Sequence, residues 1–582
     1  MLKFDDYISS IPDLPYDNFA QMVDATSRDN ASKDAIKYRS GKQREFTVWN
    51  YARWGDECRR IARGLLAAGL VKGDRVVLWS ENRPEWMSVW MGTAIAGIVI
   101  VPVDFLATEQ ECLNIIQITR AKAFFYSGRK KEFAASLPSN GINVSVSVCI
   151  SPDIEDAPAD HETEYSHFGK NSGGQTLPPI DSISPNDPAS IVFTSGTTGF
   201  AKGVTLSHKN IIANAGAAIR ILRVTPKDVF IDVLPLHHTY PTTCSFIVPL
   251  SMGIPTVIAE KIVGKVVIDD IRDGGVTFLI AVPLLYDKVM AAIEAGYNKL
   301  SPIIRGPLNV LRKVALAKAR QGNAEFGRKV FRFIRKKAGL HSIYIMVAGG
   351  GALNIKTADF FDSLGFNIVQ GYGMSENSPL ISVNTPFHKR NESVGLPVSY
   401  TDVRIVDVGP DGNGEIACKS PSVMLGYFEN EEATKEVITP DGYLLTGDLG
   451  YRDELGFIYI SGRKKNLIVG SGGKNIYPEE VETHFHGSRA IGEILVVGRK
   501  DSSGEIIFAV TVPNYDAIKE DYPGKENDEN FINELIKKEI EEANRSLPVY
   551  KKISDFTVRK EPFEKNAQQK IRRFLYKSYE NP

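Results

Sequence analysis

The sequence predicts an α/β protein whose C-terminal part forms a separate, smaller α+β domain. From Thr47 to Val282, helical stretches alternate with short β-rich runs, which is the pattern of doubly wound parallel sheets. The last break falls at Ser461–Asn466 (SGRKKN), and about 120 residues with their own helical periodicity follow it. Because 582 residues are too many for one compact core, length alone suggests about three or four domain-sized units.

The predicted strands of the N-terminal part are short apolar runs. They are Arg75–Trp79, Ile98–Val103, Ala123–Tyr126, Ile191–Thr194, Val229–Leu234, Thr256–Ile258 and Phe278–Val282. The longest apolar run, Val89–Val103, contains two glycines and a proline and falls short of the roughly twenty residues that span a bilayer. We expect it to form a buried helix that leads into a strand ending near Asp104. His161–Asp187, rich in Gly, Ser, Pro and Asn, is expected to be a surface connection.

The segment Leu284–Gly339 is predicted to be largely helical and is strongly basic. Its cations are Arg305, Arg312, Lys313, Lys318, Arg320, Arg328, Lys329, Arg332, Arg335, Lys336 and Lys337. Basic amphipathic helices bind anionic lipid headgroups, so residues 303–337 are a candidate for peripheral membrane contact. The alternative is a helical hairpin whose charges face water.

Irregular β-containing sequence follows, and then the C-terminal domain. Short β-prone runs occur at Val403–Val406, Glu415–Cys418 and Phe457–Ile460. In the C-terminal part, Pro478 stands at a first-turn position of a predicted helix. A second helix is predicted from the apolar positions Ile532, Leu535, Ile536, Ile540 and Ala543.

Composition is that of a soluble globular protein. The chain is 43% hydrophobic and 24% charged with a formal net charge of -1, so nothing indicates a nucleic-acid partner. Five cysteines are scattered without a C-x-x-C pair, which favours buried thiols in a reducing compartment over disulfides or a zinc site. The N-terminus has acids and prolines where a signal peptide needs an apolar core, so we expect a cytoplasmic location. The oligomeric state is not predicted.

A phosphate-binding segment is indicated by TSGTTGFAKGV, Thr194 to Val204. Its glycines allow close backbone approach, its hydroxyls donate hydrogen bonds and its lysine adds positive charge. It is not a Walker loop, because Lys202 stands between Ala201 and Gly203 and a β-prone run follows in place of a helix. The alternative is a flexible surface loop, whose composition would be similar.

Four later segments give this loop its context. They are QGYGMSEN (Gln370–Asn377), YLLTGDLG (Tyr443–Gly450), GRKKNLIVGSGGKNIYPEEVE (Gly462–Glu482) and PFEKNAQQKIRR (Pro562–Arg573). In order and approximate spacing the set resembles the adenylate-forming superfamily of acyl-CoA synthetases, adenylation domains and luciferases over nearly the full length. The resemblance implies an N-terminal adenylation domain, residues 1–462, of two doubly wound sheets plus a distorted β-barrel, and a mobile C-terminal domain, residues 463–582.

The resemblance assigns roles in ATP binding. The phosphate loop corresponds to Thr194, Ser195, Gly196, Thr197, Thr198, Gly199 and Lys202, with Thr197 and Lys202 counted among the catalytic residues. Glu376 matches the acid that binds Mg²⁺, a hard cation that takes oxygen ligands and neutralises the leaving pyrophosphate. Tyr372 is expected against adenine, Asp448 on the ribose hydroxyls and Arg463 on ribose or phosphate. The remaining expected nucleotide contacts are Gly350, Gly351, Ala352, Gly371, Gly373 and Ser375.

The C-terminal domain is expected to supply a different group to each half-reaction. Lys570 matches the lysine of adenylation, where a cation offsets repulsion between the carboxylate and the α-phosphate. Here Gln569 precedes it where glycine is usual, and Lys565 is the rival. In the family this domain rotates about a hinge, here Lys465, and brings up a thiol tunnel that Gly473 would help to line.

The segment LPLHHTY, Leu234–Tyr240, borders the acyl site in this family. We expect the side chains of His237 and His238 to point to opposite sides of a strand end, which disfavours a metal site. His238, Gly350 and Gly373 are the candidate acyl-pocket residues.

The implied reaction converts a carboxylic acid and ATP to acyl-AMP and pyrophosphate, and then to acyl-CoA and AMP. The basic segment resembles an insertion in long-chain fatty acyl-CoA synthetases, so a long-chain fatty acid is the expected substrate. Three alternatives remain: a fatty acyl-AMP ligase or acyl-ACP synthetase, an aryl or cyclic-acid CoA ligase, and a non-catalytic lipid-binding protein on this fold. ATP, Mg²⁺ and coenzyme A are the implied cofactors.

Overall fold

The structure is a computed structural model that describes residues 11–39, 44–151, 163–194, 202–259, 264–469, 474–501, 504–565 and 571–580. The described residues form two compact units. The first unit contains residues up to 194, 202–402 and 419–444, and the second contains residues 403–418 and those from 445 onwards. The chain crosses between them several times, and the predicted domain boundary at 462/463 stays a prediction.

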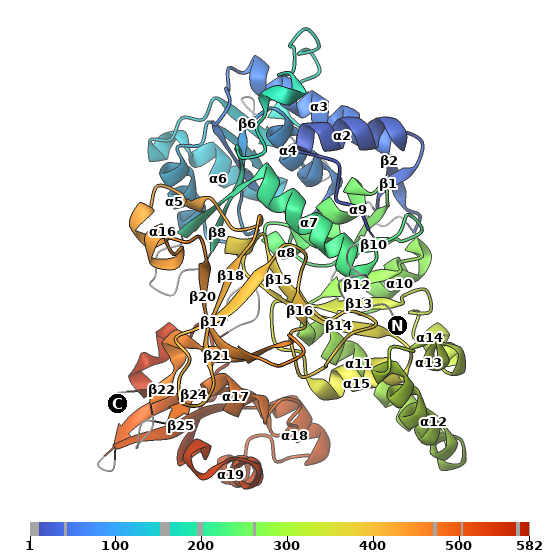
Figure 1. The fold of residues 1–582 in the computed structure, drawn as a ribbon, viewed down its shortest axis with the longest axis vertical. Helices are drawn as coiled ribbons and strands as arrows, with labels where there is room; N and C mark the ends of the chain where they lie inside the picture. Colours follow the sequence, from blue (N-terminus) through green and yellow to red (C-terminus); the bar gives the residue numbers. More distant parts are fainter. Residues whose placement is uncertain are drawn as a thin grey trace. The chain divides into compact units, whose positions relative to one another are not determined.

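The first unit contains an eight-stranded sheet that is parallel except at one edge (Figure 1). In spatial order its strands are β19 (Gly426–Tyr427), β9 (Lys202–Ser207), β8 (Pro188–Thr194), β4 (Val99–Pro102), β3 (Arg75–Trp79), β5 (Ala123–Tyr126), β6 (Val146–Cys149) and β7 (Thr163–Glu164). β9 runs antiparallel to both β8 and β19. The phosphate-binding segment therefore leaves and re-enters the sheet at neighbouring antiparallel strands.

The first unit also contains a nine-stranded sheet. In spatial order its strands are β16 (Leu396–Pro397), β15 (Leu380–Val383), β14 (Asn367–Gly373), β13 (Ile345–Ala348), β12 (Phe278–Ala281), β10 (Phe230–Asp232), β11 (Thr256–Ile258), β1 (Asp34–Tyr38) and β2 (Thr47–Asn50). The strands from β14 to β1 are parallel, and both edges are antiparallel. The parallel strands are almost continuously apolar, as strands covered on both faces require.

Helices connect and cover these sheets. They are α2 (Phe19–Asp29), α3 (Tyr51–Ala67), α4 (Pro84–Ile95), α5 (Glu109–Thr119), α6 (Lys131–Ser136), α7 (His208–Leu222), α8 (Thr239–Pro241), the π-helix η4 (Thr242–Ile247), α9 (Val248–Ser251), α10 (Gly264–Gly274), α11 (Pro283–Asn298), α12 (Pro302–Arg320), α13 (Glu325–Val330), α14 (Arg332–Lys337), α15 (Ile355–Ser363) and α16 (Glu431–Val437). α4 is buried along its whole length and leads into β4, which confirms the prediction for Val89–Val103.

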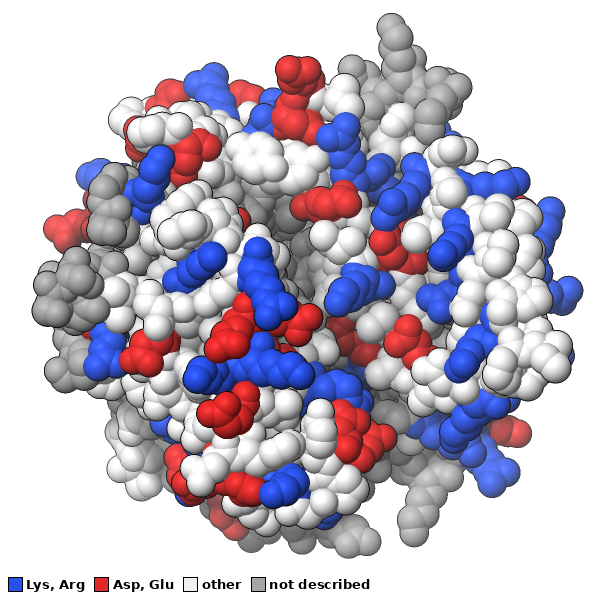
Figure 2. Space-filling view, turned by 90° about the horizontal axis from the view of Figure 1, so that it is seen from below, with Lys and Arg blue, Asp and Glu red and all other residues white. Residues whose placement is uncertain are grey.

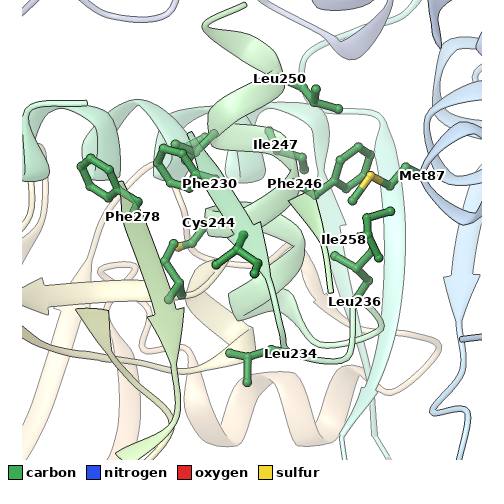
Figure 3. Close-up of a cluster of buried hydrophobic side chains, with 14 of the residues drawn as sticks. Met87, Phe230, Leu234, Leu236, Cys244, Phe246, Ile247, Leu250, Ile258 and Phe278 are labelled. Atoms are coloured by element: carbon green, nitrogen blue, oxygen red, sulfur yellow. The ribbon is translucent and has the colours of Figure 1, made fainter. Parts of the chain in front are cut away.

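The core joins strands of the nine-stranded sheet to the η4–α9 segment. Phe230 and Phe278 stack on neighbouring strands with ring centroids 4.7 Å apart. Figure 3 shows Phe246, Ile247 and Leu250 beside these strand residues. Each such side chain contributes about 1.5–3 kcal/mol when fully buried, so the core holds η4 and the residues before it against the sheet.

The second unit is built from three small antiparallel or mixed sheets and three helices. The sheets are β17 (Asp402–Val406) with β18 (Gly414–Lys419), β20 (Leu444–Arg452) and β21 (Ile458–Arg463); β22 (Ile468–Val469) with β23 (Asn475–Ile476); and β24 (Ile491–Asp501) with β25 (Gly504–Pro513) and β26 (Asp555–Val558). The helices are α17 (Pro478–Thr483), α18 (Tyr515–Asp521) and α19 (Glu529–Ser546).

The α/β class and the predicted strands are confirmed, with two differences. The expected distorted barrel is a four-stranded sheet, β17–β18–β20–β21, and no closed barrel is formed by the described strands. His237 and His238, expected at a strand end, lie in an irregular segment after β10. All five cysteines are buried thiols, and no helix of the described chain is long and apolar enough to cross a bilayer.

Candidate functional site

The two ends of the phosphate-binding segment are paired in the eight-stranded sheet. Thr194 ends β8, Lys202 begins β9, and the two residues face each other in the antiparallel ladder. The Thr194 hydroxyl donates to the Lys202 carbonyl oxygen at 3.4 Å. Ser195, Gly196, Thr197, Thr198 and Gly199 lie outside the described residues, so their predicted phosphate contacts stay predictions. The ladder nevertheless anchors both ends of the segment.

Lys202 and Glu376, predicted from separate motifs, meet on the same tyrosine. The Lys202 ammonium lies 4.8 Å from the centre of the Tyr427 ring, a cation–π contact. The Tyr427 hydroxyl donates to Glu376 Oε1 at 2.9 Å. Tyr427 is in β19, which pairs with β9, and the Glu376 carbonyl accepts from the Met424 amide at 2.8 Å. One aromatic side chain therefore links the phosphate-segment lysine to the predicted magnesium ligand.

The surroundings of Glu376 fit a magnesium ion that is shared with a nucleotide. Burial, and then the Glu376 charge, raise the pKa of Tyr427, so its hydroxyl stays a proton donor to the carboxylate. No group of three or more His, Cys, Asp or Glu side chains in the described chain forms a complete metal cage. Mg²⁺ commonly takes one or two protein carboxylates and completes its shell with phosphate oxygens and water. A single oriented carboxylate beside a phosphate-binding segment matches that donor set.

The predicted adenine-side residues lie at the end of β14. Tyr372 is buried and faces Ser382 of β15 across an antiparallel pair. At Gly373 a Cβ atom would come within 2.0 Å of the Pro379 carbonyl oxygen, so the chain requires glycine there. Ser375, at the start of the next turn, accepts a hydrogen bond from the Thr239 hydroxyl at 3.2 Å. β14 therefore carries Tyr372, Gly373 and Ser375 to one end of the nine-stranded sheet.

The glycine turn after β13 lies against the segment that follows the two histidines. A Cβ atom on Gly349 would lie 2.7 Å from the Tyr240 ring, and the Tyr240 hydroxyl donates to the Val347 carbonyl at 3.2 Å. Gly350 has a φ of +80°, which favours glycine, and Gly350 and Ala352 are exposed. The backbone of this turn is thus exposed, and its predicted contacts with the nucleotide stay predictions.

The prediction that His237 and His238 point apart is wrong. β10 ends at Asp232, so both histidines lie in an irregular segment before α8 and do not follow strand alternation. Their ring centroids are 4.0 Å apart, and His237 Nε2 lies 3.6 Å from Asp104 Oδ2. Burial lowers the pKa of His238 to about 4 and that of His237 well below its usual value, so both rings are neutral at pH 7.

Asn82 holds the histidine segment in place. It was not among the residues that the sequence predicted for the site. Its amide donates to Asp232 Oδ2 at 2.7 Å and to the Leu234 carbonyl at 2.6 Å, while its oxygen accepts from the Leu236 amide at 2.9 Å. Asp232 is fully buried, and burial raises its pKa well above the ordinary value. Asn82 therefore bonds one oxygen of a buried carboxyl group and fixes the backbone that precedes His237.

A small cavity with about 10 Å³ of space for water adjoins the α8–η4 segment. Its wall comes from α4, β4, β8, β9, α7 and the α8–η4 segment, and includes Trp90, Val192, Leu206, Ile211, Thr239 and Thr242. The hydroxyl of Thr242 donates to the Leu236 carbonyl, so it does not require a polar ligand. Thr239 connects the cavity to the nucleotide motif, because its hydroxyl bonds Ser375. A small, largely apolar space is thus linked by one hydroxyl contact to Ser375, the residue before Glu376.

In the second unit, two predicted ribose-binding residues form an ion pair. Asp448 in β20 faces Arg463 in β21, and Arg463 Nε lies 2.7 Å from Asp448 Oδ1. The Asp448 side chain is 7% exposed and that of Arg463 is 44% exposed, so the arginine is the more accessible partner. The pairing orients the carboxylate, and the predicted contacts to ribose stay predictions.

Glu415 supports this pair from β18 and was also missed. Its Oε1 accepts from the Gly447 amide at 2.9 Å, and its Oε2 lies 2.7 Å from the Lys464 ammonium. Gly447 has a φ of +71°, so the turn before Asp448 needs glycine. Burial and the nearby Arg463 lower the pKa of Lys465, the predicted hinge residue.

The predicted catalytic lysine and the thiol-tunnel glycine, Lys570 and Gly473, lie outside the described residues. The rival lysine is described: Lys565 Nζ lies 2.7 Å from Glu493 Oε1 in an ion pair, which occupies it within the second unit. Lys565 also bridges to Ile571, so the two described residues that flank 566–570 are held together.

Tyr427 and Asn82 were missed because no local pattern marks them. Tyr427 lies in a two-residue strand, and Asn82 in a loop after β3, so neither carries a periodicity or a motif spacing. The carboxylate of Glu415 could have been suspected, since an acid inside a β-prone run needs a partner when it is buried.

Comparison with known proteins identifies the class. The AMP-binding enzyme family matches residues 23–428, and the AMP-binding enzyme C-terminal domain matches residues 465–581. Long chain acyl-CoA synthetase 7, peroxisomal, of Arabidopsis thaliana is 28% identical over 538 residues, 88% of this chain and 76% of that protein. Long-chain-fatty-acid–CoA ligase ACSBG2 of Xenopus laevis is 28% identical over 498 residues, 81% of this chain and 66% of that protein.

Solved structures share the fold. The anthranilate CoA ligase AuaEII in complex with anthranoyl-AMP has a TM-score of 0.77 at 20% identity and covers 98% of both chains. ATP-bound MatB from Rhodopseudomonas palustris has a TM-score of 0.75 at 22% identity, over 97% of this chain and 99% of that one.

The chain belongs to the AMP-binding enzyme family. It is an adenylate-forming ligase, as its sequence predicted, and ATP and CoA are the substrates of the acyl-CoA synthetases that it resembles.

Replacing Tyr427 by Phe should weaken the magnesium dependence of the first half-reaction. The substitution removes the hydroxyl that orients Glu376 and keeps the ring beneath Lys202. Loss of a group that orients a metal ligand commonly costs 10- to 100-fold in metal affinity, so half-maximal pyrophosphate exchange should need about 10-fold more Mg²⁺. Tyr443→Phe is the control, because that hydroxyl bonds Asp402 instead. An unchanged Mg²⁺ requirement would disprove the orienting role.

Proposed function

We propose that the protein activates a long-chain fatty acid as acyl-AMP, with release of pyrophosphate, and then transfers the acyl group to CoA. The observation that carries the substrate assignment is the largely apolar cavity, whose wall residue Thr239 bonds Ser375 next to Glu376. A carboxylate activated near Glu376 would direct its hydrocarbon chain towards this space, which has room for about one water molecule here and would have to widen to take the chain.

The energetics favour an aliphatic acid in such a cavity. Each methylene that leaves water for an apolar wall contributes about 0.8 kcal/mol. The π-helix η4 forms part of the wall, and π-type turns are frequent at functional sites. The names of the Arabidopsis and Xenopus relatives, both long-chain acyl-CoA ligases, support the same substrate class.

The first half-reaction joins two anions. A carboxylate oxygen attacks the α-phosphorus of ATP, a new P–O bond forms and the bond to pyrophosphate breaks. Lys202, held at the start of β9 against Tyr427, supplies positive charge at one end of the phosphate segment. Bound at Glu376, Mg²⁺ would neutralise phosphate charge. We assign to Lys570 the cation that offsets repulsion at the attacking carboxylate.

In the second half-reaction, a thiolate attacks the acyl carbonyl carbon and AMP leaves. Asp448 and Arg463 are assigned to the ribose and phosphate of the adenylate in both steps. Gly473 is assigned to the path of the thiol and Lys465 to the hinge that exchanges the two arrangements.

The deciding experiment measures AMP and pyrophosphate release over straight-chain acids of increasing length, benzoate and malonate, with and without CoA. We expect kcat/KM to rise about fourfold per added methylene until the chain fills its site, since 0.8 kcal/mol corresponds to that factor. AMP release should require CoA.

Other outcomes would identify the alternatives. AMP release that needs an acyl carrier protein in place of CoA would indicate an acyl-ACP synthetase, and acyl-AMP that accumulates with either thiol would indicate an acyl-AMP ligase. Preference for benzoate would indicate an aryl-CoA ligase. Absence of pyrophosphate release with every acid would favour a lipid-binding protein.

Lys570→Ala should lose adenylation by about 10²–10³-fold, the usual size of one preorganised electrostatic contact, and retain most thioester formation from supplied acyl-AMP. Lys565→Ala is the matched control, because Lys565 is paired with Glu493. Equal losses in both half-reactions for Lys570→Ala would contradict the assigned role.

Filling the cavity should shorten the preferred acid. Ile211→Phe adds volume to a wall residue, so kcat/KM for long acids should fall about 10-fold while acids too short to reach it are unaffected. Ile212→Phe is the control, because Ile212 is the next residue on α7 and is also buried but does not line the cavity. Thermal unfolding of both variants separates overpacking from substrate exclusion. An identical chain-length profile in Ile211→Phe would remove the cavity from the acyl site.

A further inference from the structure

α12 carries an apolar stripe that faces away from the core. Ile303, Pro307, Val310, Val314 and Ala317 recur at i, i+4, i+7, i+11 and i+14, so they lie on one side of the helix, and all are exposed. The exposed fractions are 86% for Ile303 and 63% for Val310, high values for aliphatic side chains. We call these five residues the outer stripe.

The opposite side of α12 packs against the rest of the first unit. Ala315 and Ala319 are buried, and α12 packs on α15 and α13. Lys318 lies at the border between this face and the outer stripe, with its Nζ 4.6 Å from the Phe326 ring centre. The fold therefore uses one face of α12 and leaves a second apolar face without a function in folding. Figure 1 shows α12 at the periphery of the first unit.

Positive charge surrounds the outer stripe. Residues 299–337 contain twelve lysines and arginines against one acid, Glu325, in a chain with a formal net charge of -1. Arg320, Arg328 and Lys329 pair with acids, and Arg335 is buried. Among the described ion pairs none involves Lys299, Lys313, Lys318, Arg332, Lys336 or Lys337. Lysines and arginines predominate on the right of the view in Figure 2, the side on which α12 to α14 lie in Figure 1.

We propose that the outer stripe and the cations beside it dock the protein on an anionic lipid surface. A helix with an exposed apolar stripe and flanking lysines lies in the plane of the membrane interface, with its apolar side chains among the acyl chains. Lys313 and Lys318 flank the stripe on α12 and are placed to contact lipid phosphates.

Charge and shape favour lipid over two other occupants. A second copy of α12 packed on the stripe would bring like charges at Lys313 and Lys318 together, which opposes helix pairing. An acidic protein would satisfy the charges, but a patch led by Ile303 at 86% exposure offers it few polar anchors. A bilayer interface accommodates both the apolar stripe and the cations.

The test is co-sedimentation of the full chain with vesicles, without ATP, acid or CoA, so that its result does not depend on the proposed reaction. Vesicles are phosphatidylcholine alone or phosphatidylcholine with about a third phosphatidylglycerol, enough anionic lipid to attract basic segments. We expect binding at least about 10-fold tighter to the anionic vesicles and weaker binding as salt is added.

Two variants separate the apolar and ionic contributions. Ile303→Ser with Val310→Ser should weaken binding about 10-fold or more, and Lys313→Glu with Lys318→Glu about 30-fold or more, given about 1 kcal/mol per cation at the surface. The controls change equally exposed residues elsewhere: Leu106→Ser with Val549→Ser, and Lys537→Glu with Lys538→Glu. The controls should bind vesicles like the wild type.

Several results would overturn the proposal. They are absence of vesicle binding, equal binding to both vesicle types, and equal losses in test and control variants. A dimer in solution that the serine variant abolishes, without vesicle binding, would assign the stripe to a second copy. Binding to an acidic carrier protein that both α12 variants abolish, again without vesicle binding, would assign it to a protein partner. The thermal unfolding temperature of each variant, compared with that of the wild type, checks that it is folded.

Discussion

The antiparallel pairing of β8, β9 and β19 is the constraint on which the first half of the candidate site depends. It fixes Thr194 and Lys202 as neighbours and adds Tyr427 beside them, so that the tyrosine reaches Glu376 from a strand partner. In a purely parallel sheet a helical crossover would follow β8, and the lysine would leave the ladder. The hydrogen bonds of three strand ends therefore bring a cation, an aromatic ring and a carboxylate into contact.

Packing against the core holds the histidine segment, residues 234–240, in a fixed position. The aromatic core around Phe230 and Phe246 holds η4, while Asn82 bonds one carboxyl oxygen of the buried Asp232 and two backbone groups of the segment itself. The segment contacts the Gly349 turn through Tyr240, and Thr239 and Thr242 line the apolar cavity. The Thr239 hydroxyl thus occupies a fixed position between Ser375 of the nucleotide motif and the space assigned to the acyl chain.

In the second unit, ion pairs orient the predicted site residues. In the first unit, the Tyr427 side chain does so. Asp448 and Arg463 face each other across two strands, and Glu415 holds the turn before Asp448 together with Lys464. A half-exposed arginine beside a buried carboxylate can exchange its partner for a ligand at modest cost, because solvent already screens much of the pair. The site residues of this unit are therefore oriented before any ligand binds.

The sequence by itself determined the α/β class, most strands, the buried α4–β4 run and the motif residues, because these depend on local periodicity and on residue types within short windows. The tertiary structure alone decided which side chains meet. It placed Tyr427 between Lys202 and Glu376, brought the His237 and His238 rings into contact, and left one side of α12 facing solvent. Strand register, loop path and the choice of the covered helix face arise from contacts between segments distant in sequence, and no short window contains that information.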